Sequence, residues 1–163
     1  MSLHENLEQN CRNDYEPHTW IGLVLDHFAQ AEQALGKFSV ELGLPIANGS
    51  LSSLNEVRNR LQKVENKKCR ALDKRIDRWV ANRPFRHLLA HATVTTLFDA
   101  AGQVVVVTRH LPRDADDVTP DRVWNIEDQQ DLLRKARSDS RSICDHVNNL
   151  SADLVCLKAL REA

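Results

Sequence analysis

The chain has 163 residues, a formal net charge of −1, five glycines and five prolines. This length fits one domain with a sizeable core, and the scarcity of Gly and Pro excludes a turn-rich β-sandwich or barrel. A hydrophobic content of 42% with 28% charged residues excludes a disordered chain, and the near-neutral charge excludes a protein that binds nucleic acid with its whole surface.

Residues 16–43 are predicted to form a long first helix, because apolar side chains recur at spacings of three and four. These are Trp20, Val24, Phe28, Ala31, Leu35, Phe38 and Leu42. Pro17 suits its first turn, and Gly43 followed by Pro45 ends it. After a loop at 44–52, Ser52 or Ser53 is expected to cap a second helix. The apolar seam of that helix shifts between Val64 and Leu72, so a break is expected near residues 66–69.

Pro84 is predicted to start a new short helix over 85–92, because proline disfavours helical backbone at the residue before it and suits a first turn. The pattern then changes to that of strands. Residues 93–98 and 103–109 are rich in β-branched side chains and flank a turn at 99–102. They predict a β-hairpin at about 93–109, followed by a connection rich in Pro and Asp at 111–123.

Asn125 and Asp128 resemble a capping arrangement at the start of the last helix. That helix is expected to run for roughly 35 residues, or about 50 Å at 1.5 Å per residue. Its apolar stripe is Leu133, Ala136, Ser140, Ile143, Val147, Leu150, Leu154 and Leu157. The predicted fold class is all-α: an antiparallel helix bundle with long first and last helices and one β-hairpin excursion. Residues 1–15 are expected to be a flexible N-terminus, and residues 16–163 a single domain.

The sequence predicts a cytoplasmic protein without membrane contact, because it has neither a long apolar run nor a signal peptide at Met1–Asn13. The four cysteines form no Cys-x-x-Cys pair, which argues against a zinc knuckle. Cys69 and Cys144 fall among apolar helix positions and are expected to be reduced core thiols. The three tryptophans are expected to be core or interface anchors. No glycine-rich phosphate-binding motif is present, so no cofactor is expected.

The near-neutral total conceals two blocks of charge. Residues 67–87 hold eight basic and two acidic residues, or +6, whereas residues 113–131 sum to −5. A basic stretch of this kind attracts phosphate, and Lys74, Arg75, Arg78 and Arg83 are the candidate substrate-binding residues. An ordinary solvated helix face with local charge pairs stays open as the other interpretation.

The basic block leads into Arg86-His87-Leu88-Leu89-Ala90-His91. This segment resembles the motif of the HEPN superfamily (higher eukaryotes and prokaryotes nucleotide-binding domains): an arginine, a polar residue, a short spacer and a histidine. The tail Leu89-Ala90-His91-Ala92 is similar to the Leu-Ala-His-Gly ending of many members. A hairpin after the motif and a long final helix are similar to a bacterial branch of the superfamily, so the resemblance in layout covers roughly residues 16–160.

The resemblance implies an all-helical domain that cleaves RNA without a metal, in a homodimer that pools two motifs. By resemblance, Arg86 binds the phosphate and stabilises the transition state, His91 is general base or acid, and His87 orients the pair or contacts substrate. These roles suit the chemistry, because histidine titrates near neutral pH and arginine presents a planar fork to phosphate. A toxin or defence protein with an antitoxin partner is a further implication. Some family toxins carry a modified Tyr two residues after the motif histidine, whereas Thr93 stands here.

Three alternatives remain at this level. Positions five apart on a helix point about 140° away from each other, so Arg86 lies at a frayed first turn or pairs with His91 across a dimer. His87 and His91 share a face and could bind zinc with a distant third ligand such as His110, although Leu88 stands where a zincin motif has Glu. Finally, the motif could have only a structural role, in a non-catalytic module that binds RNA or protein.

Overall fold

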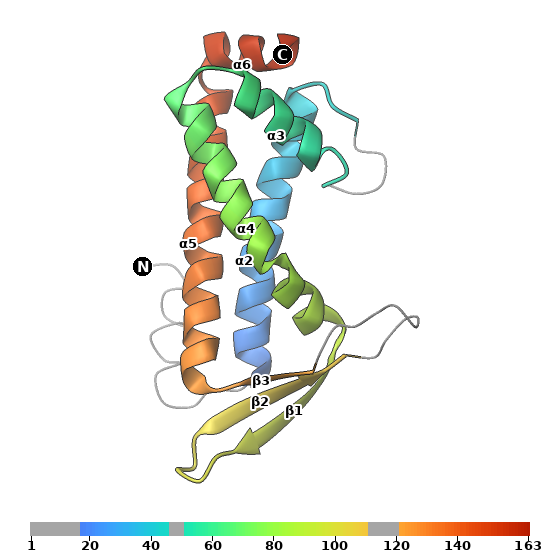
Figure 1. Ribbon diagram of the computed structural model, residues 1–163, viewed down its shortest axis with the longest axis vertical. Coiled ribbons are helices and arrows are strands. Elements are labelled where there is room, and N and C mark those ends of the chain that lie inside the picture. Colours follow the sequence, from blue (N-terminus) through green and yellow to red (C-terminus); the bar gives the residue numbers. More distant parts are fainter. Residues whose placement is uncertain (1–16, 46–50, 111–120) are drawn as a thin grey trace. The chain divides into compact units, whose positions relative to one another are not determined.

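The computed structural model describes residues 17–45, 51–110 and 121–163 (Figure 1). Its helices are α2 (Pro17–Glu41), α3 (Leu54–Lys63), α4 (Lys67–His91), α5 (Ile126–Ser151) and α6 (Leu154–Glu162), and its strands are β1 (Thr93–Phe98), β2 (Val104–Arg109) and β3 (Arg122–Trp124). The described chain is therefore mainly helical, with one small antiparallel sheet. The predicted N-terminal segment 1–15 and most of the predicted connection 111–123 lie outside the described residues.

The chain divides into two compact units, and each is described by itself. Unit 1 comprises the chain up to Leu25 together with Phe85–Leu133, and unit 2 comprises Asp26–Pro84 together with Arg134–Ala163.

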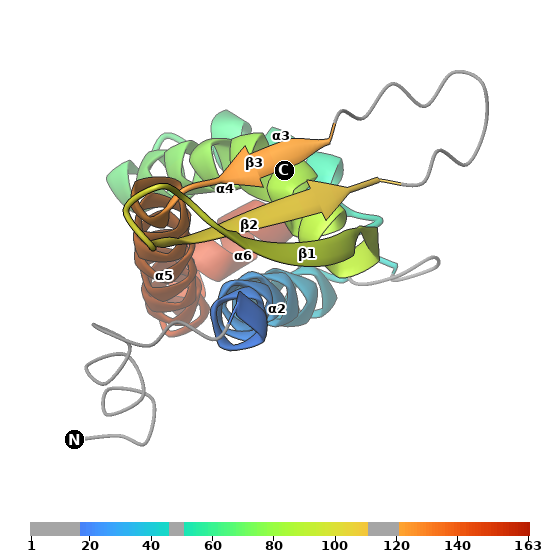
Figure 2. The same ribbon diagram turned by 90° about the horizontal axis from the view of Figure 1, so that it is seen from below.

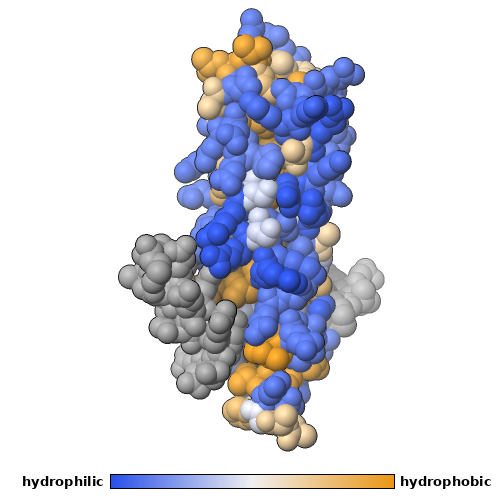
Figure 3. Space-filling model, turned by 90° about the vertical axis from the view of Figure 1, so that its left-hand side faces the viewer, coloured by the Kyte–Doolittle hydropathy of each residue, from blue (hydrophilic) through white to orange (hydrophobic). Residues whose placement is uncertain are grey.

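None of the described helices is both long and apolar enough to span a membrane. Hydrophilic residues cover most of the face drawn in Figure 3, with hydrophobic side chains visible only in small areas.

The sheet of unit 1 confirms the predicted hairpin and adds a strand. β2 lies between β1 and β3, and both pairings are antiparallel (Figure 2). Asp99 shapes the turn between β1 and β2, because its carboxylate accepts hydrogen bonds from the backbone N–H groups of Ala101 and Gln103, both at 2.8 Å. Gly102 follows with a φ of 75°, a conformation that favours glycine. β3 was not predicted, since three residues are too few to show the alternation typical of a strand.

The core of unit 1 is built around Trp124, which is 1% exposed. Its ring lies 5.5 Å from that of Trp20 and 5.5 Å from the edge-on ring of Phe85. Its indole N–H donates to the Thr108 hydroxyl at 3.0 Å, and the Trp20 indole donates to the Gln129 carbonyl at 2.8 Å. The prediction that these tryptophans are core anchors is confirmed, and both satisfy their buried N–H groups.

The secondary-structure elements in the described part of unit 2 are all helices. Gly43 (φ 73°) ends α2 as predicted, because its N–H bonds to the Val40 carbonyl and the Leu44 N–H bonds to the Ser39 carbonyl, which is a Schellman arrangement. The buried side chains form stripes along each helix, as the apolar spacing predicted. They include Phe28, Leu35, Phe38, Leu61, Leu72, Ile76, Trp79, Ile143, Leu150 and Leu160.

The start of the second helix is partly as predicted. α3 begins after Ser53, but the Ser53 hydroxyl donates to the Pro45 carbonyl and makes no capping hydrogen bond. A break is confirmed, but it lies slightly earlier than the predicted residues 66–69, since α3 ends at Lys63 and α4 begins at Lys67.

The predicted helix start at Pro84 is wrong, because α4 runs without interruption from Lys67 to His91 and contains Pro84. An interior proline removes one backbone hydrogen bond and disfavours the helix. Burial on both sides offsets this: Trp79 is 1% exposed in unit 2, and Leu88 and Leu89 are each 4% exposed in unit 1. Packing therefore stabilises helical backbone that local propensity disfavours.

The predicted final helix of roughly 35 residues is also wrong, because α5 ends at Ser151 and a separate α6 begins at Leu154. Asp153 causes the break by capping the new helix: its carboxylate accepts a hydrogen bond from the Cys156 N–H at 3.2 Å. Leu154 consequently leaves the predicted apolar stripe and is 76% exposed. The predicted cap at the start of α5 is confirmed, since the Asn125 side chain accepts from the Asp128 N–H at 2.8 Å.

Candidate functional site

The three motif residues lie in the last two turns of α4, within unit 1. Leu88 and Leu89 are buried between them and fix the orientation of the helix end. The Ala92 N–H donates to the Leu88 carbonyl at 2.9 Å and closes the last turn. Arg86 and His87 are half-buried and His91 is exposed, so the motif borders solvent.

His87 and His91 share one face of α4. Their ring centroids lie 4.6 Å apart with an interplanar angle of 52°, as expected for positions four apart. Arg86 belongs to regular helix far from the first turn, because α4 begins at Lys67. The expectation of a frayed first turn at Arg86 is therefore wrong, and regular helix geometry directs Arg86 and His91 about 140° apart.

A third histidine joins this pair through the strand register. Thr93 of β1 pairs with Arg109 of β2, so the next residues in the register are Ala92 and His110. The His110 ring centroid consequently lies 6.0 Å from that of His87. His110 is 9% exposed, and its backbone N–H donates to the Asp121 carboxylate at 3.1 Å.

Among the described residues, no metal-binding group includes the three histidines. Among residues 17–45, 51–110 and 121–163, no group of three or more His, Cys, Asp or Glu side chains is arranged to hold a metal ion. The zinc alternative thus gains no third ligand from this part of the chain. The geometry instead suits proton transfer, because imidazoles can exchange protons with a substrate at a solvent-exposed helix end.

The four predicted substrate-binding residues lie in unit 2 and have different environments. Arg83 is half-buried, and its guanidinium carbon lies 5.5 Å from the centre of the Trp79 ring, which indicates a packing role. Lys74 is exposed. Arg75 and Arg78 line a hollow of about 530 Å³, whose other lining residues are Ala81, Asn82, Arg134, Lys135, Ser138 and Asp139. We call this the basic hollow.

Asp139 is the acidic member of the basic hollow and is 6% exposed. Desolvation by burial raises the pKa of its carboxyl, while the charges of Arg75 and Arg78, a hydrogen bond from Asn82 and the charge of Lys135 act in the opposite direction. The sequence analysis found Arg75 and Arg78 from the charge block. Arg134, Lys135 and Asp139 were not predicted, although the spacing of four between Lys135 and Asp139 along one helix was a visible signal.

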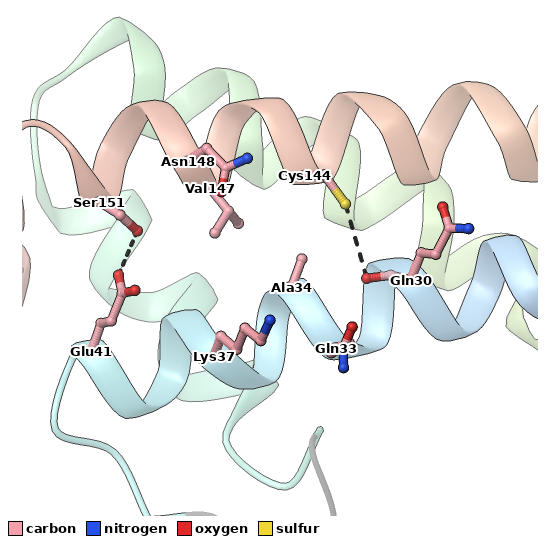
Figure 4. Close-up of a pocket in the computed structure, with 9 residues that line it drawn as sticks. All are labelled: Gln30, Gln33, Ala34, Lys37, Glu41, Cys144, Val147, Asn148 and Ser151. Carbon is pink, nitrogen blue, oxygen red and sulfur yellow. Dashed lines mark hydrogen bonds between the residues drawn. The ribbon is translucent and has the colours of Figure 1, made fainter. Parts of the chain in front are cut away.

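A second hollow of unit 2, of about 330 Å³, lies between α2 and α5 (Figure 4). Its walls are bridged by the Ser151 hydroxyl, which donates to the Glu41 carboxylate, and by the Cys144 thiol, which lies 3.9 Å from the Gln30 carbonyl oxygen. Cys144 is half-buried rather than a core thiol, and burial raises its pKa. The thiol is therefore protonated near neutral pH, which disfavours a role as nucleophile.

No family model, no curated protein and no solved structure matches this chain. The function is therefore inferred from the residues and their geometry.

Proposed function

We propose that this protein is a metal-independent endoribonuclease of the HEPN type, acting as a homodimer in the cytoplasm. The observation that carries the proposal is the histidine pair at the exposed end of α4, with ring centroids 4.6 Å apart and Arg86 adjacent to His87 in the sequence. Two imidazoles and one guanidinium are the groups that RNA cleavage without a metal needs. A toxin or defence role with an antitoxin partner is part of the same proposal, and its only support is the resemblance of the motif.

The proposed reaction is attack of the ribose 2′-oxygen on the neighbouring phosphorus. His91 accepts the 2′-OH proton as the bond between the 2′-oxygen and phosphorus forms. His87, in its protonated form, donates a proton to the 5′-oxygen as the bond between that oxygen and phosphorus breaks. The products are a 2′,3′-cyclic phosphate and a free 5′-hydroxyl. Histidine suits both steps because it titrates near neutral pH.

Arg86 is proposed to bind the scissile phosphate and stabilise its charge in the transition state. Regular helix geometry directs Arg86 away from the face that His87 and His91 share. We therefore propose that Arg86 of one subunit complements the histidines of the other.

The proposed packing of α2, α4 and α5 within unit 2 is that of an antiparallel bundle, supported by the buried stripe on each helix.

The test is cleavage of RNA under single-turnover conditions with EDTA present. His91→Ala is expected to lower the rate constant by about 10²–10⁴-fold, the usual contribution of general acid–base catalysis. Arg86→Ala is expected to lower it by about 10²–10³-fold. The matched control is His18→Ala, which removes an exposed histidine outside the cluster. Equal rates for wild type and His91→Ala, or cleavage by neither at large enzyme excess, would exclude the proposed activity.

A non-catalytic binding module is the second candidate, and exposed apolar side chains on β1 and β3 favour it. Phe98 and Leu97 at the end of β1 are 71% and 49% exposed, and Val123 of β3 is 61% exposed. Exposed apolar side chains on a short sheet suit contact with a partner. Retained RNA or protein binding without His91-dependent cleavage would favour this candidate. A monomer mass by light scattering at micromolar concentration would count against the composite site.

A further inference from the structure

The basic hollow between α4 and α5 concentrates positive charge from two helices. Arg75 and Arg78 contribute from α4, and Arg134 and Lys135 contribute from α5. We infer that the basic hollow binds the phosphate backbone of RNA without regard to base sequence; in naming RNA, this inference rests on the proposed function.

The charges of the hollow favour an anionic ligand. Four cationic side chains and one carboxylate line a volume of about 530 Å³. Arg78, Arg134 and Lys135 are exposed and Arg75 is half-buried, so the cations border solvent. Arginine and lysine at this density raise the local concentration of polyanions, and guanidinium groups bind phosphate oxygens with paired hydrogen bonds.

Asp139 limits the charge of the hollow without cancelling it. It is buried, it accepts a hydrogen bond from Asn82, and it lies within electrostatic reach of Arg75, Arg78 and Lys135. A buried carboxylate next to cations restrains their positions while leaving a net positive site. Neutralising Asp139 should therefore strengthen the binding of a phosphate ligand.

The lining also indicates how the ligand is recognised. No aromatic side chain is among the described residues that line the hollow, and its uncharged polar members are Asn82 and Ser138. Proteins that stack successive bases use aromatic side chains as the platform, whereas phosphate contacts need only cations and donors. Contacts with the backbone alone do not distinguish base sequences.

The experiment measures binding by fluorescence anisotropy with a labelled 2′-O-methyl RNA of mixed sequence. This probe lacks the 2′-OH, so the wild-type protein cannot cleave it by the proposed route and the readout does not depend on catalysis. The variant of the basic hollow combines Arg75→Gln and Arg134→Gln. It is expected to bind at least about tenfold more weakly and to lower the slope of log affinity against log salt by about 1.4, at about 0.7 for each lost phosphate contact.

The matched control combines Arg70→Gln and Arg141→Gln, which removes the same charge from exposed positions of α4 and α5 outside the hollow. Equal weakening by both pairs would overturn the inference, because it would show an effect of net charge alone. Asp139→Asn is expected to tighten binding severalfold, and unchanged or weaker binding would count against the site. Far-UV circular dichroism checks that each variant is folded.

Competition identifies the ligand chemistry. Unlabelled RNA is expected to displace the probe at much lower concentration than polyglutamate of equal charge. Equal displacement would overturn the assignment to phosphate and indicate an acidic protein partner instead. If the protein shows no His91-dependent cleavage but its RNA binding still depends on the basic hollow, the proposed nuclease is refuted and the inferred binding site is supported.

Discussion

The Sγ atoms of Cys69 and Cys156 lie 3.6 Å apart in the interior of unit 2. Cys69 is completely buried and Cys156 is 5% exposed. Burial, followed by the hydrogen bond to Cys156, raises the pKa of Cys69 to about 12. The contact joins the first turn of α4 to the first turn of α6, and both sulfur atoms act there as small apolar groups.

Cys69 and Cys156 are expected to resist alkylation by iodoacetamide at pH 8 in the folded protein. The thiolate is the reactive form, and burial both disfavours it and blocks access. Half-buried Cys144 is expected to react before either. Peptide mapping by mass spectrometry, with a urea-unfolded sample as reference, checks the order. Alkylation of Cys69 as fast in the folded as in the unfolded chain would contradict the buried pair.

Asp139→Asn is expected to stabilise the protein increasingly as the pH rises. The pKa of Asp139 is raised above its ordinary value of 3.8, so the folded state binds the proton more tightly than the unfolded state. Below pH 3.8 the Asp139 carboxyl is protonated in both the folded and the unfolded state, so its burial does not lower the free energy of unfolding. Above its raised pKa the carboxyl is ionised in both states, and its burial lowers the free energy of unfolding by the full amount. The difference in unfolding free energy between variant and wild type should therefore grow across this window in urea denaturation series. A difference that is independent of pH would show that Asp139 ionises as freely as in the unfolded chain.

Asn125→Ala is expected to lower the free energy of unfolding by about 1 kcal/mol, within the usual range for loss of a helix cap. The side chain of Asn125 accepts the hydrogen bond from the Asp128 N–H that would otherwise be unsatisfied in the first turn of α5. Asn149→Ala is the matched control, since Asn149 is exposed near the other end of α5. Equal effects of the two substitutions in urea denaturation would argue against the capping role.

The effects of His87→Ala and His91→Ala on cleavage are expected to be strongly non-additive. If one imidazole accepts the proton and the other donates it, loss of either disables the pair. The double variant should then be about as slow as the slower single variant in single-turnover assays. Multiplicative losses would indicate independent roles, with His87 contacting substrate rather than transferring a proton.

Much of the helical content was predictable because its causes are local. Gly43 ends α2, and Asn125 caps α5, through hydrogen bonds with residues close in the sequence. The predicted hairpin likewise depends on β-branched residues around one turn. The predictions of a helix start at Pro84 and of one unbroken helix across Asp153 are wrong for opposite reasons. Packing of both flanks keeps α4 helical through Pro84, whereas the cap formed by Asp153 ends a periodic pattern that continues across it.

The candidate site likewise has one part that the sequence predicts and another that depends on the tertiary structure. Arg86, His87 and His91 are visible in the sequence, as is the shared face of the two histidines, because helix periodicity alone relates positions four apart. The proximity of His110 to His87 depends on the register of β1 and β2. A single sequence favours a hairpin but does not specify which residues outside it meet.

The sequence by itself determined the helical class, the hairpin, the first helix with its end, and the motif at the end of α4. Only the tertiary structure decided that β3 joins the sheet, that His110 approaches His87, and that Arg134, Lys135 and Asp139 complete the basic hollow. The physical reason is the range of the interactions. Backbone preference and periodicity act within a few residues, whereas strand pairing and side-chain packing join residues far apart in the chain.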